Sequence, residues 1–223
     1  FWGTRELLNV NNRQKVGKLF SDYISRGGQS LNYIFRSKQL KQILALTLIF
    51  YFAVSLFGMG FPIYLKQSFQ IPDYYFGIIG SASALLGIAF MLFAEKMTKI
   101  LGYRILLGLF LIILSVLFYL FGFARNITDA LVIILIVEAV IFGWYPIYQS
   151  FFNKFIQEEV RASVLSVQSI INLSATALGE LGVGILITYF AFPKIIQILC
   201  LLFLIPLFIL FSSEKKISQS SSF

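Results

Sequence analysis

Glu138 and Glu180 are the residues in this sequence whose type and position are the strongest indication of chemistry. Each is the single charge in a long apolar block, Glu138 in 130–153 and Glu180 in 162–193. An ionisable side chain within such a block is costly, and it usually faces a helix-bundle interior or an aqueous cavity. Glu138 lies about eight residues, ~12 Å, and Glu180 about ten residues, ~15 Å, from the same end of the predicted helices. Two carboxyls at similar depth on neighbouring helices would not both ionise, so one would bind a proton.

Further polar side chains accompany both glutamates at helical spacing. Positions 138, 142, 145, 149 and 153 recur at steps of three or four and share one face, as do 168, 172, 176 and 179 on the next block. A protonated glutamic acid in a structural hydrogen bond between helices would also account for either carboxyl. The functional interpretation is that these faces line a polar cavity and that Glu138 and Glu180 take up and release protons.

The amino-acid composition indicates the class of protein to which these residues belong. Of the 223 residues, 58% are hydrophobic and 13% are charged, against about 25% charged in a soluble domain. This excludes a soluble enzyme, a secreted disulfide scaffold and a disordered tail. The sequence has no histidine, which excludes histidine-based metal sites and Ser-His catalysis, and its one cysteine, Cys200, lies in an apolar block.

The apolar blocks are long enough to cross a bilayer, which needs about 20 residues per helix. The predicted fold is therefore an all-α polytopic membrane protein with six transmembrane helices, because only helices satisfy their own backbone in lipid. The Gly58–Pro62 stretch is expected to kink or unwind the end of the first helix, and the third and sixth helices, poor in polar residues, to face lipid all round. The predicted spans are 42–65, 74–94, 105–124, 130–153, 162–190 and 195–213.

The lysines and arginines predict the orientation. Fifteen of the eighteen lie in the segments 1–41, 95–104, 154–161 and 214–223, and three lie in the alternate loops. The positive-inside rule then places both termini in the cytoplasm. Segment 1–41 is predicted to be a basic cytoplasmic loop with short amphipathic helices, and 214–223 a cytoplasmic tail. The basic residues of segment 1–41 are more consistent with orientation and anionic lipid than with nucleic acid.

Two loop sequences carry a resemblance to a known family. Residues 153–166 read Asn-Lys-Phe-Ile-Gln-Glu-Glu-Val-Arg-Ala-Ser-Val-Leu-Ser, with Glu158 and Arg161 in a charged turn and an Arg-Ala-small-x-x-Ser stretch opening the next helix. Residues 95–104 retain Gly102 and Arg104 of a Gly-x-x-x-Asp-Arg-x-Gly-Arg-Arg loop, but Lys99 replaces its aspartate. With six spans and this orientation, the chain resembles the carboxyl-terminal half of a major facilitator superfamily transporter.

The resemblance implies a function and a set of candidate residues. Such a half would line a central cavity together with an amino-terminal half and work by alternating access. It would carry a small solute, as in drug-type exporters, coupled to a proton or cation at Glu138 and Glu180, in the plasma membrane of a prokaryote. It would need no cofactor, metal or nucleic acid and would not be an enzyme. The substrate-cavity candidates are Tyr51, Tyr64, Tyr145, Gln149, Gln168 and Asn172.

Two other functions remain open on the sequence. Glu138 and Glu180 could act as general acid and base in an intramembrane hydrolase, although neither Val137-Glu138-Ala139 nor Gly179-Glu180-Leu181 looks like the motifs of aspartyl membrane proteases. A non-transporting six-helix membrane subunit or lipid-handling protein would instead fold stably and move no solute.

Overall fold

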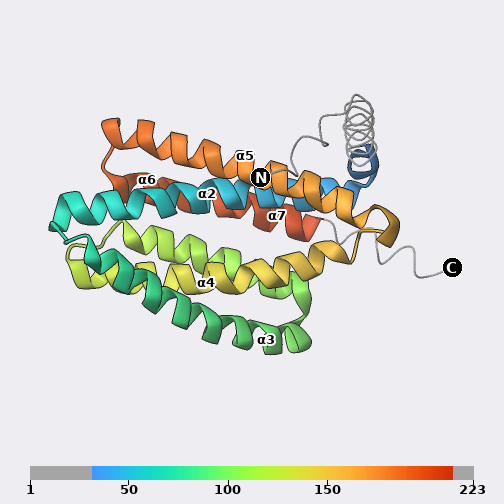
Figure 1. The fold of residues 1–223 in the computed structure, drawn as a ribbon, viewed down its shortest axis with the longest axis horizontal. Coiled ribbons are helices and arrows are strands. Elements are labelled where there is room, and N and C mark those ends of the chain that lie inside the picture. The colour runs from blue at the N-terminus through green and yellow to red at the C-terminus, as the bar shows by residue number, and fades with distance from the viewer. Residues whose placement is uncertain (1–31, 213–223) are drawn as a thin grey trace, which may run out of the picture.

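The computed structural model describes residues 32–212, and within them the chain is helical, with no strand. The long helices are α2 (Lys38–Phe69), α3 (Tyr74–Phe121), α4 (Ile127–Asn153) and α5 (Arg161–Tyr189). A last apolar stretch consists of α6 (Phe192–Leu199), η3 (Cys200–Phe203) and α7 (Leu204–Ser212), and the short η2 (Glu158–Val160) precedes α5 (Figure 1). The all-α class is confirmed. Residues 1–31 of the predicted loop 1–41, and the whole predicted tail 214–223, lie outside the described residues.

Helix α3 contains a reversal of the chain. Its 48 residues would span ~72 Å as a straight helix, more than twice the ~30 Å of a bilayer core. Gly102 breaks it with φ 78° and ψ 163°, a backbone region open essentially to glycine alone. Figure 1 shows the chain turning back there, so α3 consists of a first arm, 74–101, and a second arm, 103–121.

The lengths of the apolar helices match the spans predicted from the sequence. Five helical stretches of the described chain are long and apolar enough to cross a membrane, α3 being counted once. With the two arms of α3 counted separately there are six, and the predicted spans fall on them to within a few residues. The number of membrane crossings and the domain assignment stay predictions.

Capping groups fix the helix ends. Ser37 Oγ accepts a hydrogen bond from the Leu40 N–H at the start of α2, and Asn126 Oδ1 accepts one from the Asp129 N–H at the start of α4. The sequence predicts a kink or an unwinding at the Gly58–Pro62 stretch; the unwinding does not occur, because α2 continues through Pro62 to Phe69. Proline removes a single intrahelical hydrogen bond, and Gly60 lies directly against the Phe192 ring, which supports the helix there.

The helices pack as two pairs. The first arm of α3 and α4 form one pair, α2 and α5 the other, and the α6–η3–α7 stretch covers α2 and α3. Figure 1 shows α2 between α5 and α4 over the half of the bundle away from Arg161, whereas α5 contacts α4 directly near Gln168. The helix ends around Lys38, Gly102, Asn153 and Arg161 lie together at one end of the bundle, here called the basic end; the other is called the opposite end.

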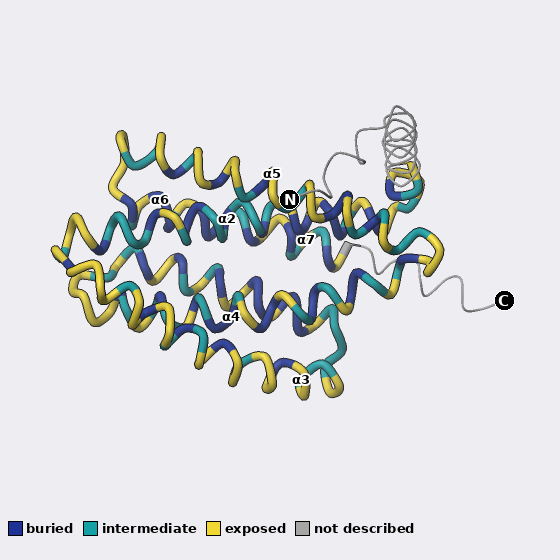
Figure 2. Tube along the Cα trace, in the orientation of Figure 1, coloured by how far each residue is buried: buried dark blue, intermediate teal, exposed yellow. Residues whose placement is uncertain are grey.

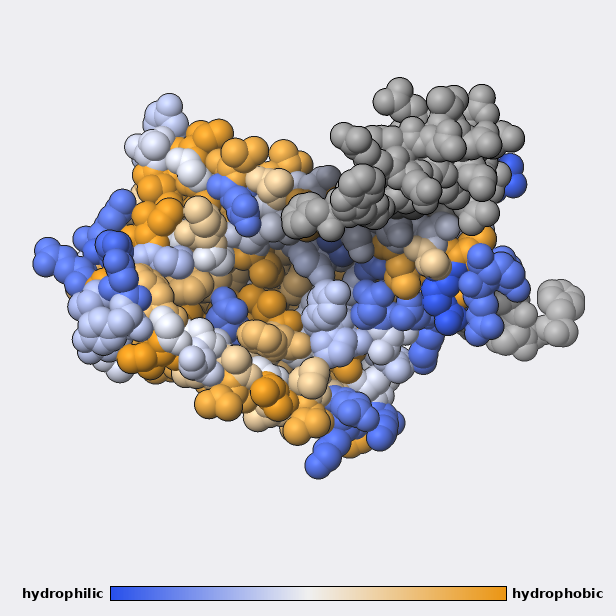
Figure 3. Space-filling model, viewed as in Figure 1, coloured by the Kyte–Doolittle hydropathy of each residue, from blue (hydrophilic) through white to orange (hydrophobic). Residues whose placement is uncertain are grey.

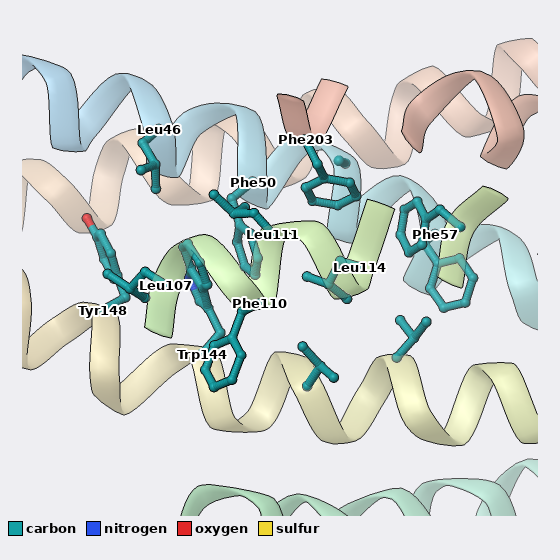
Figure 4. Close-up of a cluster of buried hydrophobic side chains, with 14 of the residues drawn as sticks. Leu46, Phe50, Phe57, Leu107, Phe110, Leu111, Leu114, Trp144, Tyr148 and Phe203 are labelled. Carbon is teal, nitrogen blue, oxygen red and sulfur yellow. The ribbon is translucent and has the colours of Figure 1, made fainter. Parts of the chain in front are cut away.

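One expectation about lipid contact is wrong. The sequence predicts that the second arm of α3 and the last apolar stretch face lipid all round, yet Leu107, Leu114 and Phe118 are fully buried, as is Phe203. Phe118 packs edge-to-face on Phe203 with ring centroids 5.0 Å apart. Figure 4 shows a cluster of buried side chains from this region converging with those of α2 and α4 in the core. Lipid and protein core are equally apolar, so composition alone does not distinguish the two faces.

The surface carries a broad apolar band. Figure 3 shows hydrophobic residues across the middle of the molecule and hydrophilic ones gathered at its two ends. Helix α5 contributes strongly exposed apolar side chains, among them Leu173, Leu181 and Ile185, and its outer side is largely exposed in Figure 2. A band of this kind suits a protein that sits in a bilayer.

Candidate functional site

A stack of aromatic rings lies in the bundle core, between its middle and the basic end. Trp144, Tyr148 and Phe152 follow one another at steps of four on α4, which puts them on one side of that helix. Trp144 stacks on Phe50 of α2 with centroids 4.2 Å apart, and Tyr148 lies nearly parallel to Trp144 at 6.1 Å. All four side chains are almost completely buried. The stack therefore fixes where the Tyr148 hydroxyl lies.

That hydroxyl is the centre of a hydrogen-bond chain through three helices. Thr47 of α2 bonds the Ile43 carbonyl at 2.6 Å and the Tyr148 hydroxyl at 2.6 Å. Because a carbonyl only accepts, the Thr47 hydroxyl donates to Ile43 and Tyr148 donates to Thr47. Gln168 Nε2 of α5 donates to the Tyr148 oxygen at 3.0 Å and to Gln149 Oε1 of α4 at 3.3 Å. We call Thr47, Tyr148, Gln149 and Gln168 the polar chain.

The polar chain is a strong constraint in these surroundings. Thr47 and Tyr148 are completely buried and Gln168 is 3% exposed. Buried polar groups without partners cost about 1–3 kcal/mol each, so this set specifies how α2, α4 and α5 fit together at the basic end. Gln149 is only half-buried and its amide nitrogen has no partner among residues 32–212.

The structure brings several predicted cavity residues together. Gln149 and Gln168 are hydrogen-bonded to each other. Tyr145 is 57% exposed on α4, and Tyr51 is half-buried on α2, about one turn from Thr47. Asn172 stands one turn beyond Gln168 on α5, and its Oδ1 is buried without a hydrogen-bond partner. Gln149 and Gln168 belong to the polar chain, and Tyr51, Tyr145 and Asn172 each stand about one helical turn from one of its members.

Tyr64 does not belong to that group. It packs in an aromatic cluster at the opposite end, with its ring 5.6 Å from Phe121 and 5.7 Å from both Phe69 and Phe192. Along α2 it is about 17 residues, ~25 Å, from Thr47. It is partly buried and packs against the core, which accounts for the residue without a solute.

The two glutamates are not a pair in this structure. Helix α5 packs on α2 and helix α4 on α3, and Figure 1 shows α2 lying between α4 and α5 toward the opposite end. Glu138 is half-buried and Glu180 exposed, and neither has a hydrogen bond or ion pair with any residue of 32–212. Equal depth did not place the carboxyls together, because depth says nothing about which helix lies between them. Each remains a separate candidate for proton coupling.

The comparison with protein families decides the class of protein. Residues 43–222 match the model of the Major Facilitator Superfamily. The chain belongs to the Major Facilitator Superfamily. No curated protein and no solved structure matches it. Membership supports a multi-pass membrane transporter for small molecules, as the resemblance predicted.

The predicted loop residues of this superfamily chain lie at a chain reversal, in a charged turn and in a pocket. Gly102 makes the reversal of α3, and Lys99, which replaces the family's aspartate, pairs with Glu95 at 3.6 Å. Glu158 and Arg161 form the predicted charged turn, with 3.8 Å between their charged atoms. Arg104 is half-buried, in a pocket with Gln39 and Phe155 among its lining residues, and has no ion pair within the described chain.

A cavity of about 380 Å³ opens at the basic end between α3 and α4. Glu95, Thr98 and Tyr103 of α3 face Ile147 and Ser150 of α4 across it. It holds none of the predicted solute residues. We therefore take the candidate site of this superfamily chain to be the group around the polar chain rather than this cavity.

Sequence reasoning missed Thr47 and Tyr148. It selected the face of α4 that carries Glu138, Tyr145 and Gln149, which proves to be the open face, whereas Tyr148 lies on the buried one. The step of four from Trp144 to Tyr148 to Phe152 is a signal that could have identified a buried aromatic stripe. Tyr148 is the member of that stripe whose hydroxyl needs a partner.

Proposed function

We propose that this chain is the carboxyl-terminal half of a secondary active transporter that moves a small solute by alternating access. The observation that carries the proposal is the polar chain, with Gln149, Tyr145, Tyr51 and Asn172 beside it on the open faces of α4, α2 and α5. A buried polar assembly within an apolar bundle is expensive, and in membrane proteins it marks a solute or ion pathway. Contacts from a second half would complete the cavity.

The exposed side of α5 supports a missing partner half. Leu173, Leu178 and Leu181 are each about 60–70% exposed, beside polar residues such as Asn172 and Thr176 that are half-buried. A face that mixes polar and apolar groups in this way suits a protein neighbour around a cavity better than lipid tails. The amino-terminal half of the same transporter is the partner proposed for it.

The solute proposed is a small amphipathic molecule, with export of the drug type. Gln149 and Asn172 offer amide groups, and Tyr51 and Tyr145 offer rings that also carry hydroxyls. Apolar pockets with a few placed polar groups favour such ligands. The basic end is proposed to face the cytoplasm of a prokaryotic cell, following the fifteen basic residues on that side.

Proton coupling is proposed at Glu138 and Glu180, each acting on its own helix. Glu138 is half-buried and unpaired within the described chain, and Glu180 lies next to the contact of α5 with α2 at Gly179. A carboxyl that alternates between a dry and a wet surrounding binds and releases a proton as the transporter changes its conformation. The coupling would make the protein an antiporter or a symporter.

The experiment uses the intact protein in liposomes with an imposed pH gradient, ethidium as the transported probe and a pH-sensitive dye inside. We expect Glu138→Gln to abolish gradient-driven ethidium accumulation while exchange without a gradient continues. We expect Glu180→Gln to weaken the gradient-driven accumulation. Glu95→Gln is the matched control, because Glu95 is an exposed glutamate of α3 paired with Lys99. Unchanged gradient-driven transport in the Glu138→Gln/Glu180→Gln double variant would refute the coupling.

A further inference from the structure

The seam between the first arm of α3 and α4 has a register fixed by two glycines. A methyl group at Gly87 would lie 2.5 Å from Cγ of Phe142, and one at Gly143 would lie 2.7 Å from Cδ1 of Phe90. There is no space for a side chain at either glycine, so the two helices are in close contact at these points. Gly87 therefore lies level with Phe142. Figure 1 shows the first arm and α4 running in the same direction. Positions that are equally far back along the two helices therefore lie level as well.

One turn back from this contact, the register places Ser83 level with Glu138. Ser83 lies about four residues, ~6 Å along the axis, before Gly87, and Glu138 lies the same distance before Phe142. Ser83 is 3% exposed, and its hydroxyl has no hydrogen-bond partner. Neighbouring Ser81 donates to the Gly77 carbonyl at 2.9 Å, the usual bond for a helical serine. Ser83 does not make that bond, so its buried hydroxyl is free to donate across the seam.

The surroundings of Glu138 offer its carboxyl little else. Phe50 stacks on Trp144, so the antiparallel α2 presents residues 53–60 at this level. Neither these residues, nor 79–87 of the first arm, nor 110–118 of the second arm include a titratable side chain. On α4 itself the nearest titratable groups are Tyr145, two turns away, and Asp129 near the start of the helix. Ser83 is the buried, unpaired polar group at the level of Glu138.

We propose that Ser83 is a positioning residue for Glu138. After a rotamer change of the Glu138 side chain, the Ser83 hydroxyl hydrogen-bonds the Glu138 carboxyl. This rests on the proposed role of Glu138 in proton coupling. A serine hydroxyl donates to the ionised carboxylate and accepts from the protonated acid, so it serves both states. The charged form gains more, because a hydrogen bond to an ionised group is about twice as strong as a neutral one.

The test is infrared difference spectroscopy of the intact protein in lipid, recording the carboxylic acid C=O band as pH is varied. Glu138→Gln identifies the band by removing it. We expect Ser83→Ala to move the midpoint of its titration upward by about one pH unit, the effect of losing one hydrogen bond to a charged group. Ser83→Thr, which keeps a hydroxyl, should titrate like the natural protein, and so should the control Ser81→Ala.

The outcomes separate this proposal from the proposed function. If Glu138→Gln removes a titrating band and Ser83→Ala leaves its midpoint unchanged, the role of Ser83 is overturned and that of Glu138 stands. If Glu138→Gln removes no titrating band at all, both fail. If Ser83→Thr shifts the midpoint as far as Ser83→Ala does, packing at position 83 and not the hydroxyl is responsible, and the proposal is again overturned.

Discussion

Helices α2 and α5 come into close backbone contact at Gly179, and replacement of this residue by alanine should separate them. A β-carbon at Gly179 would collide with Ser55 Oγ and would lie 2.5 Å from the Phe52 carbonyl oxygen and 3.2 Å from the Leu56 nitrogen. Two of these three atoms are backbone, so no rotamer change relieves the contact. The distance to the carbonyl oxygen is about 1 Å short of an ordinary van der Waals contact. The two helices would have to move apart by a similar distance.

The cost can be estimated by comparison with a glycine on the same helix. Overpacking a well-packed contact costs about 1–3 kcal/mol, while alanine in place of glycine within a helix gains about 0.5–1 kcal/mol. Gly184, also on α5, has no atom within 4 Å of the point where a methyl group would lie, so Gly184→Ala gains the helix contribution alone. The difference in unfolding free energy between the two variants should therefore be about 1–3 kcal/mol, all of it from the crossing.

The assay is a titration of the purified intact protein with denaturing detergent, using the midpoint of thermal unfolding where unfolding is irreversible. Gly179→Ala should unfold earlier than Gly184→Ala. Adding Ser55→Ala to Gly179→Ala should recover part of the loss, because it removes the hydroxyl but leaves the Phe52 carbonyl in place. Equal stability of the two single variants would contradict the close crossing of α2 and α5.

Two further substitutions test the polar chain and the reversal of α3 with the same unfolding assay. Tyr148→Phe removes the donor to Thr47 and the acceptor for Gln168, and should lower the free energy of unfolding by about 1–2 kcal/mol. Tyr145→Phe, on the open face, should change stability little. Equal effects of the two substitutions would argue against the buried role of Tyr148. Gly102→Ala forces a side chain into a glycine conformation and should cost about 1–3 kcal/mol, while Gly80→Ala, with open space around it on the same helix, should cost nothing.

The number and approximate bounds of the apolar helical stretches could be read from the sequence, because each is close to the length that a bilayer requires. The basic residues Lys96, Lys99 and Arg104 marked the place where α3 turns back. The packing direction of Leu107 and Phe118 could not be read, since a side chain that meets lipid and one that meets the core have the same composition.

The candidate site was predictable only in part, for a related reason. The spacing of Gln149 and Gln168 showed that each lay on a polar face, and the structure joins them by a hydrogen bond. The burial of Tyr148 depends on α2, whose Phe50 and Thr47 come from about a hundred residues earlier in the chain. The separation of Glu138 from Glu180 also depends on α2, and helical periodicity within one segment contains no information about a third helix between two others.

The contacts of α5 indicate where motion could occur in this half. The polar chain holds α5 to α2 and α4 near the basic end, and the Gly179 crossing holds it to α2 about 11 residues, ~17 Å, further along. A helix fixed at two separate levels cannot tilt against α2 without breaking a buried hydrogen bond or opening a backbone contact. The described helices are therefore expected to move together, and alternating access would take place between this bundle and its proposed partner half. The largely exposed apolar side of α5 is the surface along which that motion would occur.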